Sequence, residues 1–600
     1  MRDFLKHTFA TVLGLLIFFG ISIGAFVLLV VSIGSRETGP EVKDKSVLVF
    51  DLSLNITDAA RNSSTSQAFQ EAIVGEDNDS MTLRTVLDAI NEASRDPRIV
   101  ALYLSGNGEG TSSTGLAALK EVREALQRFR QAGKTIIAYD DNWREREYYL
   151  GSVANTVALN PSGEMEFNGL SSESAFYAGA LRKFGVGIQV TRVGKYKAAV
   201  EPLLLTRRSP ENREQTETLL RDVWNELLVA IGKERKLSPQ QLQSIADRQG
   251  LLLAEEAKKR GLVDRVAYLD EVIEDLKKLA GKDSDEEKSF RQISIRSYAD
   301  VAESAIKRKQ SSDKQIAVIY AEGDIVSGQG GVGEVGGDRL ARQLRQLRQD
   351  EDVKAVVLRV NSPGGSAIAS DVIQREVILT RKKKPVIVSM GSLAASGGYW
   401  ISTYADRIFA EPNTITGSIG VFGVQPNFQA IANNNGVTWD VVKTGRFADS
   451  QTVSRPKTPQ ELALLQKSVD QIYDQFLTKV SESRKLPKAK VAEIAQGRVW
   501  SGQRAKDLGL VDELGGLETA IQEAAKRAKL GDDWKIEEYP RSRSFEERLF
   551  EQFTGDQTSS RRVDPLMTQF KNVQSDLAML RSMNDPRGVY ARLPFNLRIE

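Results

Sequence analysis

The sequence predicts an α/β protein with mainly parallel strands, built from one domain that occurs twice. Three observations support this prediction. Short apolar runs rich in Val and Ile alternate with amphipathic helical segments, which is the pattern of strand–helix–strand units. The same motifs recur in the same order in the second half of the chain. With 600 residues, the chain also exceeds what a single core organises.

An uncharged apolar run near the N-terminus covers residues 9–33. About 20 apolar residues span the hydrocarbon core of a bilayer as a helix, so this run predicts a transmembrane anchor. Arg2 and Lys6 precede it, which predicts that residues 1–8 are cytoplasmic and that the bulk of the chain lies across the membrane. A bacterial plasma membrane and a thylakoid-type membrane are both compatible. A cleavable signal peptide is the alternative, but no clean A-x-A site follows the run.

Composition excludes several kinds of active site. The chain has no cysteine, and its one histidine, His7, precedes the apolar run. Thiol nucleophiles, cysteine-containing metal sites and a Ser-His-Asp triad in the body of the protein are therefore excluded, and we expect no metal and no cofactor. The net charge of +2 does not point to nucleic acid, so no nucleic-acid partner is expected. A hydrolytic serine needs another base, and lysine is the usual substitute.

The duplication is visible in paired motifs that keep their order and spacing. The pairs are strands 46–51 and 315–320, strands 98–104 and 354–360, the aromatic segments 148–150 and 399–401, Gly169 and Gly420, the helix starts 209–210 and 458–459, and the identical stretches 261–264 and 509–512. In the second copy, Leu340, Leu344 and Leu347 mark the apolar face of a helix. A whole domain is therefore predicted twice.

These pairs set the predicted boundaries. The first repeat covers residues 46–281 and the second covers residues 315–543. Between them, residues 282–314 are rich in charged residues and serine, which is typical of a solvated linker. Residues 544–600 form a polar tail to which no function is assigned.

Residues 390–400 place a serine and two glycines where a predicted strand is followed by a helix. Such a turn can present the Ser396 hydroxyl on a sharp backbone, and the first amides of the helix, Gly397 included, lack helical partners and can face negative charge. These features suit a serine nucleophile. Taken alone, however, this stretch favours a plain glycine-rich turn without chemistry.

The two copies differ reciprocally at two positions. Ser396 aligns with Glu145 of the first copy, whereas Lys197 of the first copy aligns with Ala448. The reciprocal pattern predicts one composite site where the copies meet. An ordinary lysine, with a pKa near 10.4, is protonated at neutral pH, but burial lowers this pKa by several units and makes the amine a base. Lys195 and Lys443 remain rival bases, and most lysines are solvated surface residues.

Two further turns carry small residues. In residues 361–366, Gly364 and Gly365 let a ligand approach the backbone and, with the amide of Gly397, can supply an oxyanion hole. In residues 416–421, Ser418 can hydrogen-bond the lysine amine and orient its lone pair. Each segment alone also suits an ordinary turn.

Together, residues 194–202, 361–366, 394–400 and 416–420 make the chain resemble the signal peptide peptidase A (protease IV) family in its long, duplicated, membrane-anchored form. The resemblance runs from the anchor to about residue 540. It implies two tandem Clp protease/crotonase-like repeats and a serine–lysine dyad. Ser396 would be the nucleophile, Lys197 the general base and Ser418 the residue that steadies the lysine, with Gly365 and Gly397 as amide donors to the oxyanion.

The resemblance also implies a ring-like homotetramer that degrades cleaved signal peptides. Peptides, and the bilayer through residues 9–33, are therefore the expected partners, and the protein is expected to be a serine endopeptidase. Two alternatives stay open from the residues: a crotonase-like acyl-CoA enzyme that uses the same glycine turns, and a membrane-anchored scaffold of the same fold without activity.

Overall fold

The structure is a computed structural model that describes residues 7, 14, 18, 40–59, 80–106, 113–283, 289–309, 312–539 and 589–592. The predicted anchor, residues 9–33, lies outside the described residues except for two isolated helical positions. Over the described part of the chain, no helix combines the length and the apolar character needed to cross a membrane.

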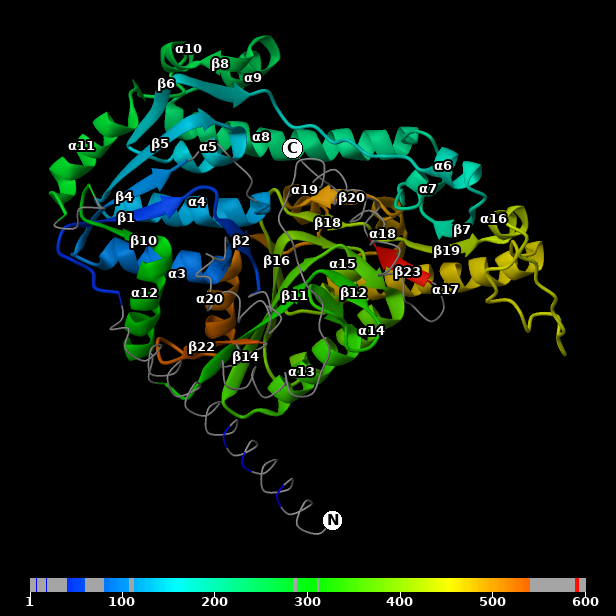
Figure 1. The fold of residues 1–600 in the computed structure, drawn as a ribbon. Coiled ribbons are helices and arrows are strands. Elements are labelled where there is room, and N and C mark those ends of the chain that lie inside the picture. The colour runs from blue at the N-terminus through cyan, green and yellow to red at the C-terminus, as the bar shows by residue number, and fades with distance from the viewer. Residues whose placement is uncertain are drawn as a thin grey trace.

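The first repeat is built on a seven-stranded sheet with strand order β10-β1-β4-β5-β6-β8, in which β9 also pairs with β6 (Figure 1). Strands β1, β4, β5 and β6 are parallel, as the sequence predicts. The strands are β1 (Ser46–Asp51), β4 (Ile99–Ser105), β5 (Thr135–Trp143), β6 (Thr156–Phe167), β8 (Gly250–Leu253), β9 (Arg265–Val266) and β10 (Gln292–Ser294).

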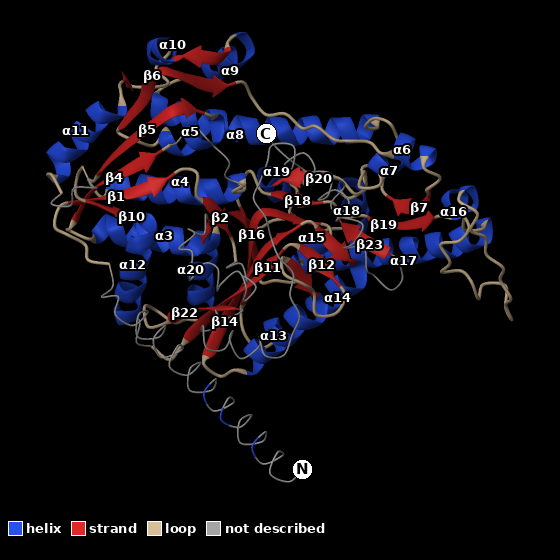
Figure 2. Cartoon of the chain, in the orientation of Figure 1, coloured by secondary structure: helices blue, strands red, loops and turns tan. Residues whose placement is uncertain are grey.

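Helices cover both faces of this sheet (Figure 2). Successive side chains of β4 point to opposite faces, so Leu102 and Leu104 join one core while Ala101 and Tyr103 join another. The first core includes α3 (Leu83–Arg95), α4 (Leu116–Gln131), α5 (Glu145–Gly151), α8 (Pro210–Arg235), α9 (Pro239–Arg248), α10 (Ala254–Lys259) and α12 (Ile295–Lys309). The second core includes α11 (Leu269–Ala280).

The second repeat has the same layers around an eight-stranded sheet of order β20-β18-β16-β14-β11-β22, in which β17 also pairs with β16 and β21 pairs with β17. Its strands are β11 (Gln315–Glu322), β14 (Val353–Ser362), β16 (Val386–Ala395), β17 (Arg407–Ala410), β18 (Ile415–Gly417), β20 (Val499–Ser501), β21 (Glu513–Leu514) and β22 (Lys535–Tyr539). Its helices are α13 (Gly337–Gln349), α14 (Ala367–Arg381), α15 (Gly397–Ser402), α17 (Pro459–Arg484), α18 (Lys488–Ile494), α19 (Gly502–Asp507) and α20 (Leu517–Arg527). In α13 the predicted apolar face, Leu340, Leu344 and Leu347, is buried.

Two long helices show how closely the repeats match. Helices α8 and α17 have 26 residues each and both begin with proline. The side chains of Ser209 and Thr458 cap their first turns, as the sequence predicts. Both helices end at a lysine in the left-handed conformation, Lys236 (φ 57°) and Lys485 (φ 56°). The domain duplication is therefore present in the structure as well as in the sequence.

A third sheet joins the two repeats. Its strand order is β13-β12-β15-β23-β19-β7, and β7 of the first repeat pairs antiparallel with β19 of the second. The strands are β7 (Gly187–Val193), β12 (Asp324–Val326), β13 (Glu334–Gly336), β15 (Gly364–Ser366), β19 (Val421–Asn427) and β23 (Val589–Arg592). This sheet thus contains strands from the first repeat, the second repeat and the C-terminal tail.

A buried ionic cluster also holds the repeats together. The Arg359 guanidinium on β14 is fully buried and donates to Asp58 Oδ1 and to Glu121 Oε1, each at 2.7 Å. Asp58 follows β2 (Asn55–Thr57), which pairs with β3 (Ser80–Thr82), and Glu121 lies on α4, so both carboxylates come from the first repeat. Removing one partner would leave an uncompensated buried charge, which makes the cluster a strong constraint on how the repeats dock.

The prediction that residues 282–314 form a solvated linker is wrong for much of this segment. Within it, β10 pairs with β1 and extends the first sheet, and α12 buries Ile295, Tyr298, Ala299 and Ala302 against the first core. The exposed face of α12 contributes part of the charge of this segment, and beside it the short apolar face does not stand out in the sequence. The tail, residues 544–600, lies outside the described residues except for β23.

Candidate active site

Ser396 stands at the junction between β16 and α15, where the sequence predicts a sharp turn. Its backbone adopts φ 57° and ψ −111°, a conformation that residues with a side chain rarely adopt. The Ser396 amide donates to the Gly417 carbonyl (2.8 Å), and the Trp400 amide donates to the Ser396 carbonyl (2.8 Å). A Cβ on Gly398 would lie 2.6 Å from the Ser362 carbonyl oxygen, so the chain passes here only without a side chain.

Lys197 comes from the first repeat, just after β7 reaches across to the second. The Tyr196 amide donates to the Gln496 carbonyl (2.9 Å), which fixes the preceding residue on the second repeat. Two glycines enclose the lysine stem: a Cβ on Gly497 would lie 2.6 Å from Lys197 Cβ, and one on Gly420 would lie 3.2 Å from Lys197 Cδ. The sequence analysis did not identify Gly497, because its role depends on contact with a residue 300 positions away.

The two predicted residues meet inside the protein. Lys197 Nζ lies 2.8 Å from Ser396 Oγ, 2.9 Å from Ser418 Oγ and 3.0 Å from the Ser418 carbonyl oxygen. All three residues have no solvent exposure. A neutral amine has two N–H donors and one lone pair, so donation to the two Ser418 oxygens leaves the lone pair for the Ser396 hydroxyl proton.

The electrostatic environment favours the neutral amine. Burial lowers the pKa of Lys197 well below its ordinary value, and the positive charge of Arg592 lowers it further. Both influences act in the same direction. Lys197 therefore has the position and the lowered pKa that a general base for a serine requires.

The rival bases do not reach the serine. The Lys195 side chain is exposed, and its Nζ lies 5.0 Å from the centre of the Tyr196 ring. Lys443 is also exposed and donates to Asp449 Oδ1 at 2.6 Å. Ala448, the counterpart of Lys197, lies in the same exposed segment as Lys443.

The predicted oxyanion glycines lie beside the Ser396 turn. Gly364 and Gly365 belong to β15 and have φ values of 93° and 156°. A Cβ on Gly364 would lie 2.5 Å from the Gly397 amide nitrogen, and one on Gly365 would lie 2.0 Å from the Ile325 carbonyl oxygen. The Gly364 amide already donates to Ser362 Oγ (3.1 Å), which leaves Gly365 and Gly397 as the better candidates for amide donors.

The tail strand β23 occupies the space between β15 and β19. It pairs antiparallel with both, and Gly365 faces Ala591 in the register. The Ala591 carbonyl oxygen would lie 2.2 Å from a Cβ on Gly364 and 2.9 Å from one on Gly397, so this oxygen sits against the candidate oxyanion glycines. Arg592 forms an ion pair with Asp324. Nothing in the polar sequence of the tail indicates this strand.

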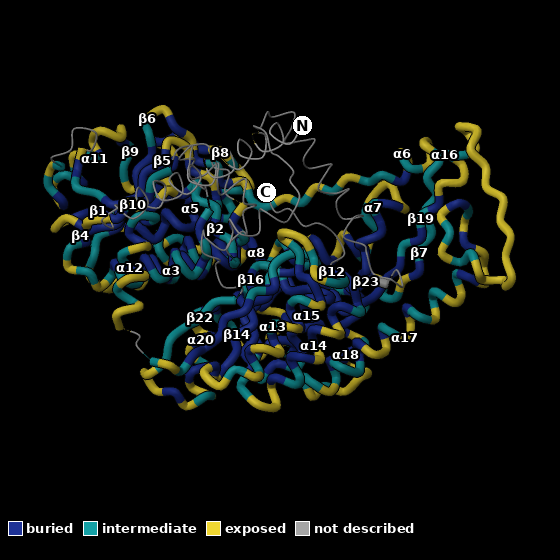
Figure 3. Tube along the Cα trace, turned by 60° about the horizontal axis from the view of Figure 1, so that its bottom comes forward, coloured by how far each residue is buried: buried dark blue, intermediate teal, exposed yellow. Residues whose placement is uncertain are grey.

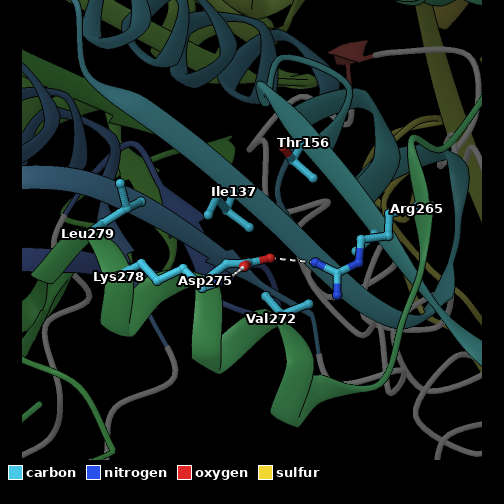
Figure 4. Close-up of a pocket in the computed structure, with 8 residues that line it drawn as sticks. Ile137, Thr156, Arg265, Val272, Asp275, Lys278 and Leu279 are labelled. Carbon is cyan, nitrogen blue, oxygen red and sulfur yellow. Dashed lines mark hydrogen bonds and ion pairs between the residues drawn. The ribbon is translucent and has the colours of Figure 1, made fainter. Parts of the chain in front are cut away.

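One further cavity lies away from the Lys197–Ser396 pair. A cavity of about 260 Å³ lies between α11 and strands β5 and β6, where Arg265 pairs with Asp275 (Figure 4). It is lined by residues of the first repeat alone and contains neither Lys197 nor Ser396. Over the described residues, no group of three or more His, Cys, Asp or Glu side chains is placed to hold a metal ion.

Known proteins resemble this chain over most of its length. The family model for peptidase family S49 matches residues 128–283 and again residues 378–531. Protease 4 of Salmonella typhi is 34% identical over 598 residues, covering 97% of this chain and 94% of the relative. Protease 4 of Haemophilus influenzae is 36% identical over 532 residues, covering 84% of each chain. The chloroplastic serine protease SPPA of Arabidopsis thaliana is 34% identical over 458 residues, covering 76% of this chain and 67% of the relative.

Proposed function

The chain belongs to peptidase family S49 and is a serine-type peptidase, and from this premise we propose that Ser396 is its nucleophile and Lys197 its general base. The observation that carries the proposal is the 2.8 Å approach of the two side chains across the boundary between the repeats, with both groups fully buried. Neither repeat holds both groups, so the catalytic unit is the docked pair.

The reaction follows from the contacts. Neutral Lys197 takes the proton of the Ser396 hydroxyl as Oγ attacks the carbonyl carbon of the substrate. The two oxygens of Ser418 accept hydrogen bonds from the amine and orient it. The amides of Gly365 and Gly397 face the negative charge that develops on the carbonyl oxygen, with Gly364 shaping the turn between them. The lysine then gives its proton to the leaving amine, the C–N bond breaks, and water hydrolyses the acyl-enzyme to restore Ser396.

The proposed substrates are cleaved signal peptides and similar apolar peptides. We further propose that residues 9–33 anchor the chain in a bacterial plasma membrane or a thylakoid membrane, with the N-terminus cytoplasmic and both repeats on the far side. Each repeat is assigned a Clp protease/crotonase-like fold, and the assembly is assigned as a ring-like homotetramer. The support for these assignments is the family resemblance of the sequence motifs together with the apolar run.

Cleavage of a fluorogenic apolar peptide by the full chain in detergent tests the dyad. Ser396→Ala and Lys197→Ala should each abolish cleavage while circular dichroism and the melting temperature show a folded protein. Lys195→Ala is the matched control, since its exposed side chain is two positions away, and it should keep full activity. Normal cleavage by either dyad variant would refute the assignment, and loss in Lys443→Ala with activity kept in Lys197→Ala would move the base to the second repeat.

A further inference from the structure

The tail strand β23 lies in the candidate site in the manner of a bound peptide. It pairs antiparallel with β15 and with β19, so its backbone takes the place that an extended substrate would take between these strands. Tyr590, Ala591 and Arg592 are all buried there (Figure 3). The Ala591 carbonyl oxygen sits against the candidate oxyanion glycines, as the carbonyl oxygen of a peptide bond under attack would. The strand therefore indicates which side chains the neighbouring positions of the groove accept.

The position before Ala591 is apolar. Tyr590 packs in a cluster with Ala199, Val200 and Phe422, and its ring centre lies 6.0 Å from that of Phe422. Ala199 and Val200 belong to the first repeat, whereas Phe422 lies on β19 of the second. An apolar side chain at this position thus contacts both repeats, which agrees with the apolar peptides of the proposed function.

The position after Ala591 is charged and buried. The Arg592 guanidinium forms an ion pair with the Asp324 carboxylate of β12, and the two side chains are 7% and 23% exposed. Burying a guanidinium without an anionic partner is costly. The Asp324 carboxylate therefore sets the sign of the charge that this part of the groove accepts.

The register of the third sheet explains how the two charged groups meet. Gly364 of β15 faces Arg592 of β23. On the other side of β15, Gly365 faces Ile325 of the parallel strand β12, so one step back along both strands sets Asp324 beside Gly364. Neighbouring strands lie about 4.8 Å apart, which puts the backbones of β12 and β23 about 10 Å apart. Gly364 has no side chain between them, and a long basic side chain spans that distance.

We propose that Asp324 forms a subsite for a basic side chain, and that the peptidase favours an arginine or a lysine directly after the bond it cleaves. The residue before that bond would be small, like Ala591, and the one before it apolar, like Tyr590. The inference rests on the proposed function, since it names a substrate feature of the same site. Asp324 takes no part in the chemistry and is a specificity-determining residue.

A basic residue in this subsite also preserves the environment of the base. The positive charge of Arg592 lowers the pKa of Lys197. A substrate must displace β23 and with it this charge. A substrate arginine paired with Asp324 would put an equivalent charge in the same place, so the amine would keep this influence while the peptide is bound.

Peptides that differ only after the small residue test the subsite on the full chain. The kcat/KM for an arginine peptide should exceed that for its glutamine counterpart by about 10-fold or more, as a hydrogen-bonded charge pair contributes. Asp324→Asn should bring the ratio close to one, and Asp324→Lys should favour a glutamate peptide instead. Asp338→Asn is the matched control, since it makes the same change at an exposed carboxylate of α13, and it should keep the original ratio.

The ratio is the quantity to measure, because Asp324→Asn also removes a contact that holds β23. Release of the tail strand raises the open fraction of the groove by the same factor for every peptide, so it changes each KM and leaves the ratio unchanged. A peptide with diaminopropionate, a cation on a one-carbon stem, should behave like the glutamine peptide, because it is too short to cross the row to Asp324.

Fluorescence anisotropy of labelled peptides in a Ser396→Ala background gives the same comparison without turnover. The arginine peptide should bind about 10-fold or more tightly than the glutamine peptide, and adding Asp324→Asn should remove the difference. No preference for arginine, or the same preference in Asp324→Asn, would overturn the subsite and leave the dyad intact. Cleavage retained by Ser396→Ala would overturn the proposed function instead, so the two failures are distinguishable.

Discussion

At the same point of the two repeats, one turn carries a serine and the other a carboxylate. In the second repeat, Ser396 meets the Lys197 amine that arrives from the first repeat. In the first repeat, the buried Glu145 carboxylate accepts from the amides of its own Asn168 (2.5 Å) and Gly169 (3.1 Å). Gly169 aligns with Gly420, which packs on the stem of Lys197. The contact between Glu145 and Gly169 therefore occupies in the first repeat the place that Lys197 occupies in the second.

The difference shows how a duplicated scaffold can give one site instead of two. The Glu145 carboxyl is hydrogen-bonded by the backbone of its own repeat and is not available to react. The Ser396 hydroxyl contacts the Lys197 amine, so its environment depends on how the two repeats dock. Burial raises the pKa of Glu145, so this carboxyl keeps its proton to higher pH than an exposed one. In the proposed mechanism, the first repeat is thus a structural copy that supplies the base.

The largest effect on peptide cleavage is expected from replacing Lys197 by the residue found at the equivalent position of the second repeat. Lys197→Ala gives the first repeat the residue of the second and should lower kcat/KM by about 10⁴-fold or more, as removal of a catalytic base does in other serine peptidases. The double variant Lys197→Ala with Ala448→Lys should stay inactive, because position 448 lies in an exposed segment. Initial rates on one peptide measure both. Recovery in the double variant would mean that the second repeat can complete its own site.

A smaller loss is expected from moving the lysine without removing it. Gly497→Ala puts a Cβ 2.6 Å from Lys197 Cβ at a backbone φ of 74°, and a misplacement of about 1 Å costs on the order of 100-fold in rate. Gly261→Ala is the control, since its φ is 78° and no atom lies within 4 Å of the added Cβ. The control should lose stability through backbone strain and keep its kcat/KM. Equal activity in both variants would contradict the enclosure of the lysine stem.

Removing the tail strand should strengthen substrate binding. Strand β23 fills the gap between β15 and β19 with Ala591 fully buried, so a peptide must displace it to reach the glycines. A chain that ends at residue 588 should show a several-fold lower KM, because the binding-competent fraction rises. It also lacks the Arg592 charge that lowers the pKa of Lys197, so KM is compared at alkaline pH, where loss of that charge matters least. Ala591→Trp in the full chain, which cannot fit the buried position, should shift KM in the same direction. An unchanged KM in both would show that β23 leaves the substrate path open.

The smallest catalytic effect is expected at the first repeat's own turn. Glu145→Ala leaves the amides of Asn168 and Gly169 without their acceptor and should lower the free energy of unfolding by about 1–3 kcal/mol. Peptide cleavage should be unchanged under conditions in which the variant is folded. Urea unfolding and initial rates measure the two quantities separately. A loss of cleavage without a loss of stability would give the first repeat a direct part in the chemistry.

Much of the scaffold could be predicted from the sequence because its signals are local and repeated. Strands such as β1 and β11 are short apolar runs, and the helix starts at Ser209 and Thr458 have capping residues followed by proline. The proximity of Lys197 and Ser396 could be predicted because the duplication supplied an internal comparison. Their catalytic roles remain predictions.

The features that escaped prediction depend on contacts between distant segments. Strand β23 binds through backbone pairing to β15 and β19, which leaves no side-chain pattern in the tail. Gly497 is needed for the space it leaves to Lys197. In α12, the buried Tyr298 and Ala302 are surrounded in sequence by charged residues that face solvent, so composition indicated a linker where the structure has a packed helix.

The central claim, that Lys197 acts as a neutral base on Ser396, is tested most directly by the pH dependence of Ser396 phosphonylation by a serine-reactive phosphonate probe. The pKa of Lys197 is lowered, so the amine is protonated and inactive only at pH values below this lowered pKa. The labelling rate should therefore rise with pH through one ionisation well below 10.5 and then stay constant, and it should vanish in Lys197→Ala. Equal labelling in Lys197→Ala, or a midpoint at the ordinary lysine value, would contradict the account.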